Sequence, residues 1–233
     1  MNNYYFVLLA FLLAGCTEKK ADVTSTTNSP YTLEECHAFW DSKLAPIITQ
    51  QLIKGETPYP EINHAFSNNF TFVVSRYGNP KVNLSTYYHP ISPLIEGASG
   101  IFTNVATTTI YIPSIIDSYI ALRNQGSSRF EEAFKTHVLV LYMHELDHLT
   151  HDPDIGNATH VDTDNEALIW ARTVEEVIEP LIEKYQAKIL RSDWRMYNAW
   201  TNAGKISNST IWLNAIRELH RGVDGKTLPA PKL

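Results

Sequence analysis

The sequence predicts an α+β fold, with strands in the N-terminal half and helices in the C-terminal half. Three short segments, at residues 69–77, 82–88 and 105–112, are rich in the β-branched and aromatic residues that favour strands. One amphipathic helix is expected before them, at residues 33–53. Apolar residues at helical spacing dominate after residue 130. Strands and helices in separate blocks indicate α+β rather than alternating α/β.

The first residues resemble a bacterial lipoprotein signal peptide. An apolar stretch, Phe6–Ala14, ends in Leu13-Ala14-Gly15-Cys16, which is similar to the lipobox that is cleaved before its cysteine. The stretch is too short to span a bilayer as a lasting helix. The resemblance implies that residues 1–15 are a signal peptide and that Cys16 carries the lipid anchor. In such proteins, an aspartate directly after the cysteine retains the protein in the inner membrane. Since Thr17 occupies this position, we expect the protein to be anchored in the outer membrane and to face the periplasm.

Residues 16–30 are expected to form a lipidated, disordered tether to a single domain at residues 31–233. The tether holds Lys, Asp, Ser, Thr and Asn with almost no apolar side chain, so it cannot form a core. The remaining length suits one globular domain. Once Cys16 is lipidated, Cys36 is the only thiol left, so no intramolecular disulfide can form. Its place within the helix at residues 33–53 indicates a buried apolar residue.

The helical segment at residues 130–143 leads into the pentapeptide HELDH, which has the pattern HExxH. Its histidines, His144 and His148, are four residues apart, so both imidazoles lie on one helix face, about 6 Å apart along the axis. Neutral imidazole binds zinc well, and the carboxylate of Glu145 can accept a proton from zinc-bound water, whose pKa is about 7. A polar cluster at the end of a buried helix needs a compensating ligand. His137, on the same face, is expected to be a satisfied core residue.

The HELDH helix resembles that of the zincin metallopeptidases, whose subclasses differ in the third zinc ligand. In the gluzincin pattern a glutamate on the next helix completes the site, and Glu166 follows His148 after 17 intervening residues. In the metzincin pattern Asp154 takes the last position, but His151 replaces the glycine that permits the turn. His151 and His160 are further alternatives. The resemblance favours Glu166 and places Asp154 second.

The zincin resemblance also implies a fold and an activity. It implies a small mixed or antiparallel sheet packed on the HExxH helix, with an edge strand that receives the substrate; residues 107–112 are the candidate, with an ordinary interior strand as the alternative. It implies a zinc-dependent peptidase that binds Zn²⁺ through His144, His148 and Glu166 and uses Glu145 as general base. The alternative function is a non-catalytic envelope lipoprotein that binds a protein or peptide partner and keeps HExxH as a structural metal site or a relic.

A helix is expected to begin at Thr163-Asp164-Asn165-Glu166, which fits a capping box. Glu166 therefore has a structural interpretation beside metal binding. The helix presents one apolar stripe, formed by Ala167, Trp170, Ala171, Val174, Val177, Ile178 and Leu181. Pro180 is expected to kink or end this helix before it continues over residues 181–190. Two further helices are expected, at residues 194–203 and 210–221.

The pentapeptide is also similar to the HExDHL segment of peptide deformylases, and Glu96-Gly97 is similar to the box that precedes that segment there. Ala98 stands where those enzymes have a metal-binding cysteine, and no GxGxAAxQ segment occurs in the chain. Deformylation is also a cytosolic task, whereas the N-terminus indicates the cell envelope. The sequence therefore favours a zincin.

Charge limits the class of partner. The formal net charge is −6 and the isoelectric point is about 5.8, so the chain lacks the basic footprint of a nucleic-acid-binding protein. The expected partners are a peptide or protein substrate and, through the lipid anchor, a membrane.

Overall fold

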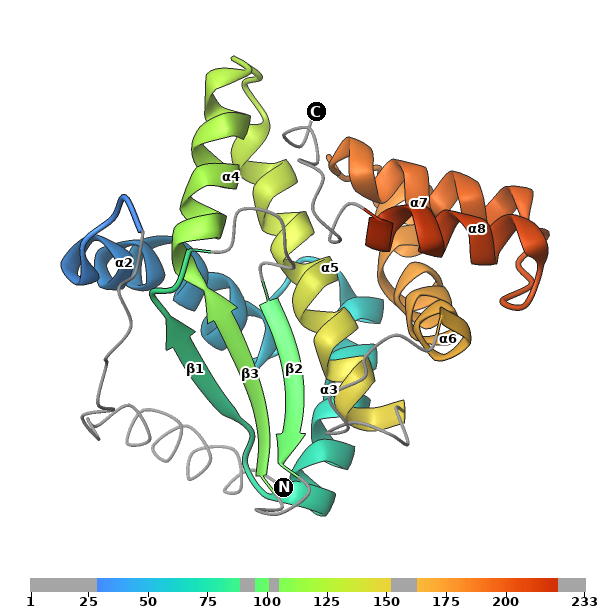
Figure 1. The fold of residues 1–233 in the computed structure, drawn as a ribbon, viewed down its shortest axis with the longest axis horizontal. Coiled ribbons are helices and arrows are strands. Elements are labelled where there is room, and N and C mark those ends of the chain that lie inside the picture. Colours follow the sequence, from blue (N-terminus) through green and yellow to red (C-terminus); the bar gives the residue numbers. More distant parts are fainter. Residues whose placement is uncertain (1–28, 89–94, 101–104, 152–162, 222–233) are drawn as a thin grey trace.

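The computed structural model describes residues 29–88, 95–100, 105–151 and 163–221 (Figure 1). In chain order its elements are α2 (Leu33–Phe39), η1 (Trp40–Leu44), η2 (Pro46–Leu52), α3 (Pro60–Tyr77), β1 (Lys81–Ser85), β2 (Ile95–Gly100), β3 (Val105–Tyr111), α4 (Ile112–Asn124), α5 (Phe130–His151), α6 (Thr163–Thr173), η3 (Val174–Ile178), η4 (Pro180–Lys184), α7 (Arg191–Asn202) and α8 (Thr210–Arg221). The η segments are π-helical. The α+β class is confirmed, with more helix in the N-terminal half than the sequence predicts.

The sheet is small and mixed, with the strand order β1-β3-β2. β1 pairs in parallel with β3, whereas β2 pairs antiparallel with it. β1 and β3 correspond to the strands predicted at residues 82–88 and 105–112. The third strand, β2, was not predicted as a strand, and it packs directly against α5 (Figure 1). The segment Glu96-Gly97, noted for its similarity to deformylases, falls on β2.

Of the two interpretations of residues 107–112, the structure confirms the interior strand and not the edge strand. Residues 107–112 belong mostly to β3, which is the central strand because it pairs with a neighbour on each side. Its backbone groups are therefore already used in the ladder. Ile112 does not continue the strand but begins α4, where Pro113 occupies a first-turn position that needs no amide hydrogen. The edge strand beside α5 is β2.

The strand predicted at residues 69–77 is also wrong, because this segment is the second half of α3. Its Phe and Val content favours strands locally, but the buried residues of the whole helix repeat at helical spacing: Ile62, Phe66, Asn69, Phe70 and Val73. Pro60 lies at the first turn, where its fixed φ favours the helix, and Gly78 follows the last turn with φ of 76°. The helical period over eighteen residues outweighs the local strand propensity.

The predicted helix at residues 33–53 is present as α2, η1 and η2 in succession. It begins with a capping box, in which Thr32 Oγ1 accepts from the Glu35 amide and the Glu35 carboxylate accepts from the Thr32 amide. Cys36 is 2 % exposed, as predicted for a buried apolar residue. Its burial raises the pKa of the thiol, which makes it a weak nucleophile.

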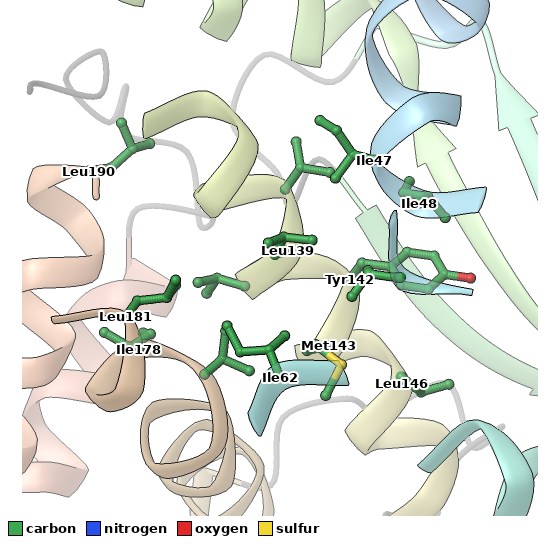
Figure 2. Close-up of a cluster of buried hydrophobic side chains, with 14 of the residues drawn as sticks. Ile47, Ile48, Ile62, Leu139, Tyr142, Met143, Leu146, Ile178, Leu181 and Leu190 are labelled. Atoms are coloured by element: carbon green, nitrogen blue, oxygen red, sulfur yellow. The ribbon is translucent and has the colours of Figure 1, made fainter. Parts of the chain in front are cut away.

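Helix α5 runs through the centre of the molecule and is buried on nearly all sides (Figure 2). Leu139, Tyr142, Met143 and Leu146 lie among apolar side chains of the surrounding chain: Ile47, Ile48, Ile62, Ile178, Leu181 and Leu190. The Tyr142 side chain forms a hydrogen bond with Thr108 on β3, and burial raises its pKa to about 12. The core therefore holds α5 against both the sheet and the C-terminal helices, so the direction of the HExxH helix is well determined.

The apolar stripe predicted after residue 163 is confirmed, since all seven of its residues are buried. The helix becomes π-helical at η3 and again at η4, which begins at Pro180. The predicted continuation to residue 190 is wrong. The helix ends at Lys184, and Gln186 adopts a positive φ of 49°, a left-handed conformation typical of helix termini. The helices predicted at residues 194–203 and 210–221 are α7 and α8.

Several predictions fall outside the described residues. These are the signal peptide at residues 1–15, the lipidation site Cys16, the tether up to residue 28, and the alternative ligands Asp154 and His160. Among the helices that the structure describes, none has both the length and the apolar composition needed to cross a bilayer.

Candidate metal centre

The structure brings His144, His148 and Glu166 together between α5 and α6. His144 and His148 lie one turn apart on α5, and their Nε2 atoms are 3.1 Å apart. Glu166 lies in the first turn of α6 and reaches both rings, with Oε1 at 3.3 Å from His144 Nε2 and Oε2 at 3.1 Å from His148 Nε2. In the described part of the chain, this is the one group of three or more His, Cys, Asp or Glu side chains that can hold a metal ion.

The spacing and chemistry of these three donors fit a tetrahedral metal ion. Zinc binds imidazole nitrogen and carboxylate oxygen at about 2.0–2.2 Å, so tetrahedral ligands on one ion lie roughly 3.3–3.5 Å from each other. The observed separations of 3.1–3.3 Å are close to that requirement. Two imidazoles and one carboxylate are also the donor types that zinc prefers. The cluster can therefore hold a metal ion.

The donors are almost completely shielded from solvent. His144 is 4 % exposed and Glu166 is 9 % exposed, and the side chain of His148 is 12 % exposed. Burial lowers the pKa of His144, against the opposing effect of the Glu166 carboxylate. A lowered pKa keeps the imidazole neutral near pH 7, which is the form that binds metals. The environment thus favours a coordinating histidine over a charged one.

Two residues of α6 fix the ring of His144. The indole of Trp170 stacks on it, with ring centroids 4.0 Å apart and an angle of 25° between the planes. At the ring edge, His144 Nδ1 lies 3.2 Å from the hydroxyl of Thr173. The stack sets the plane of the ring and the hydrogen bond sets its rotation within that plane. Together they direct Nε2 toward Glu166 and His148.

Asp147, inside the HELDH segment, is fully buried and connects three helices. Its Oδ1 accepts a hydrogen bond of 2.6 Å from the Asn69 amide on α3. Its Oδ2 lies 3.5 Å from the Thr173 hydroxyl on α6. Two nitrogen-bearing side chains are slightly farther away, with His151 Nδ1 at 3.6 Å and Arg172 Nε at 3.8 Å. A buried carboxylate needs such partners because desolvation alone would be very costly.

The remaining predicted site residues have different positions. Glu145 is 7 % exposed and lies on α5 between the two histidines in sequence. His151 is one-third exposed and faces Asp147, outside the three-donor cluster. His137 is satisfied by Asp193, whose carboxylate oxygens lie 3.1 and 3.2 Å from Nδ1, as expected for a core histidine.

Sequence reasoning missed the roles of Asn69, Trp170 and Thr173. Trp170 was predicted as a core residue, which it is, but not as a residue in contact with His144. Trp170 and Thr173 follow Glu166 by four and seven residues, so helical periodicity places all three on one face of α6. That signal was present in the sequence. Asn69 gave no local signal, because it meets Asp147 only through the packing of α3 on α5.

Comparisons with protein-family models, with curated proteins and with solved structures give no match to this chain. The interpretation of the site therefore rests on its own residues and geometry.

Proposed function

We propose that the protein is a zinc-dependent peptidase of the bacterial cell envelope. The observation that carries this proposal is the convergence of His144, His148 and Glu166 at 3.1–3.3 Å inside a buried HExxH cluster. Three protein ligands leave one tetrahedral position for water or substrate, which is the arrangement of catalytic rather than structural zinc sites. Within the described residues the cluster has three such donors.

In this proposal, bound zinc supplies Lewis acidity, which polarises a peptide carbonyl and lowers the pKa of water. His144, His148 and Glu166 hold the ion. Glu145 is the general base, which takes the proton from the attacking water and passes it to the leaving amine. Its position supports this role, because Glu145 follows His144 directly on α5 and is largely shielded from solvent, with 7 % exposure.

The sheet offers a place for an extended substrate. β2 is an edge strand of the described sheet and packs on α5, the helix that carries the histidines (Figure 1). A peptide that pairs with an edge strand binds mainly through its backbone. We therefore propose that β2, in place of residues 107–112, receives the peptide. The lipid anchor predicted at Cys16 would keep this activity at the membrane.

Glu145→Gln tests the proposal because it separates metal binding from chemistry. The full-length chain is purified after zinc supplementation, and bound zinc and cleavage of an unfolded protein are measured with and without chelator. We expect the wild type to carry about one zinc per chain and to lose activity when the metal is removed. Glu145→Gln should keep the zinc and lose at least roughly 10²-fold in activity, the scale of general acid–base catalysis.

The matched control is Glu175→Gln, which changes an exposed glutamate outside the cluster and should leave zinc and activity unchanged. A wild-type chain without zinc would contradict the metal site. A chain that holds zinc but cleaves no unfolded protein would instead support the alternative, a non-catalytic lipoprotein with a structural metal site.

A further inference from the structure

The hydroxyl of Thr173 has three polar neighbours, and two of them can only accept hydrogen bonds. It lies 3.1 Å from the Ile169 carbonyl and 3.5 Å from Asp147 Oδ2, and 3.2 Å from His144 Nδ1. Thr173 is completely buried, so water does not compete for these bonds. A hydroxyl donates one hydrogen and accepts through its lone pairs. The single hydrogen of this hydroxyl can therefore serve only one of the three neighbours at a time.

The chemistry of the neighbours decides where the hydrogen goes. The Ile169 carbonyl has no hydrogen to offer, and Asp147 is hydrogen-bonded as a carboxylate by Asn69. If Thr173 donated to His144, both acceptors would lose their bond from this buried hydroxyl. If Thr173 donates to one of these two acceptors, a lone pair of its hydroxyl oxygen can accept a hydrogen from His144 Nδ1. The second arrangement satisfies more of the groups around Nδ1, and it suits a ring whose Nε2, 3.3 Å from Glu166 Oε1, binds a metal ion shared with that carboxylate.

We propose that Thr173 is a positioning residue that holds His144 with its proton on Nδ1 and so leaves the Nε2 lone pair for the metal. The inference deepens the proposed function and rests on it for the metal, because without an ion Nε2 lies 3.3 Å from Glu166 Oε1, an acceptor that favours the proton on Nε2. Partners that orient a metal-binding histidine in this way are typically worth 10–100-fold in metal affinity. Trp170 supports the same ring position through its stack at 4.0 Å.

Two substitutions and one control test the role. Thr173→Val keeps the shape of the side chain and removes the hydroxyl, and Thr173→Ser keeps the hydroxyl. Thr150→Val removes a partly buried hydroxyl on α5 that donates to the Leu146 backbone carbonyl of the same helix. Zinc affinity is measured by chelator competition on the full-length chain. We expect a roughly 10–100-fold loss in Thr173→Val, a change below about threefold in Thr173→Ser, and none in Thr150→Val.

The outcomes separate the positioning role from the proposed function. Wild-type zinc affinity in Thr173→Val, or an equal loss in Thr173→Ser, would overturn the role even in an active peptidase. A loss in Thr173→Val that Thr173→Ser restores, in a chain that binds zinc but cleaves no unfolded protein, would support the positioning role while the proposed function fails.

Discussion

At the scale of single residues, Glu166 has two possible roles that predict different responses to one substitution. As a metal ligand it contributes charge and donor strength, both of which fall in Glu166→Gln. As a capping residue it would stabilise the start of the helix almost equally well after Glu166→Gln, because glutamine also serves in capping boxes. Since its two oxygens lie 3.1 and 3.3 Å from the imidazole nitrogens, we expect the ligand role to dominate.

Glu166→Gln should therefore weaken zinc binding by more than the roughly 10–100-fold that outer partners contribute, with only a small change in the stability of the metal-free protein. Asp154→Asn is the comparison, and it should leave zinc affinity nearly unchanged. Chelator competition and denaturant unfolding measure the two quantities. The reverse pattern, with a large loss only in Asp154→Asn, would move the site toward the metzincin arrangement.

The candidate ligands could be proposed from the sequence because their signal is local. Two histidines at helical spacing and a glutamate that opens the next helix need no knowledge of the distant chain. Asn69 and Thr173 were missed because their importance arises from contacts between helices. Asp147 lies within the HExxH segment, but its role in packing depends on a hydrogen bond from Asn69, 78 residues earlier, which no local pattern reveals.

At the scale of elements, α3 is joined to α5 through the hydrogen bond from Asn69 to Asp147. Asn69 is 5 % exposed and Asp147 is fully buried, so removing the amide leaves a buried carboxylate with one partner fewer. Asn69→Ala should lower the free energy of unfolding by about 1–3 kcal/mol, because the buried Asp147 carboxylate loses a hydrogen-bond donor. Chemical denaturation of the metal-free protein measures the change.

Asn68→Ala is the matched control, because Asn68 is the adjacent residue on α3 and is exposed. Its substitution should change stability by no more than about 0.5 kcal/mol. Equal effects in the two variants would mean that helix propensity, rather than the bond to Asp147, explains the loss.

Helices were predicted better than strands for a physical reason. The 3.6-residue period of α6 and α8 extends over three turns, so many residues support each prediction. The segment at residues 69–77 was misassigned because it was treated apart from Pro60 and the buried residues that precede it in α3. β2 contains Glu96, Gly97 and Ser99, which lack strand propensity, and it is a strand because β3 provides its partner.

At the scale of the whole molecule, the predicted lipid anchor decides where the protein is found. Cys16→Ala removes the sulfur that would receive the lipid, so the protein should leave the detergent-extracted membrane fraction or accumulate as an uncleaved precursor. Cell fractionation and incorporation of labelled palmitate check this outcome. Cys36→Ala is the control, since its buried thiol should not affect labelling. Labelled palmitate that still enters Cys16→Ala would contradict the lipoprotein prediction.

The bond between Asn69 and Asp147 also links the surroundings of the site to the folding of the chain. The histidines and Glu166 lie close together in the chain, but the group that secures Asp147 comes from 78 residues earlier. In an unfolded chain the HELDH segment lacks this bond, and only docking of α3 on α5 forms it. In the proposed peptidase, maturation of the site would therefore coincide with folding at the destination, and a newly made chain would be harmless to the proteins around it until then.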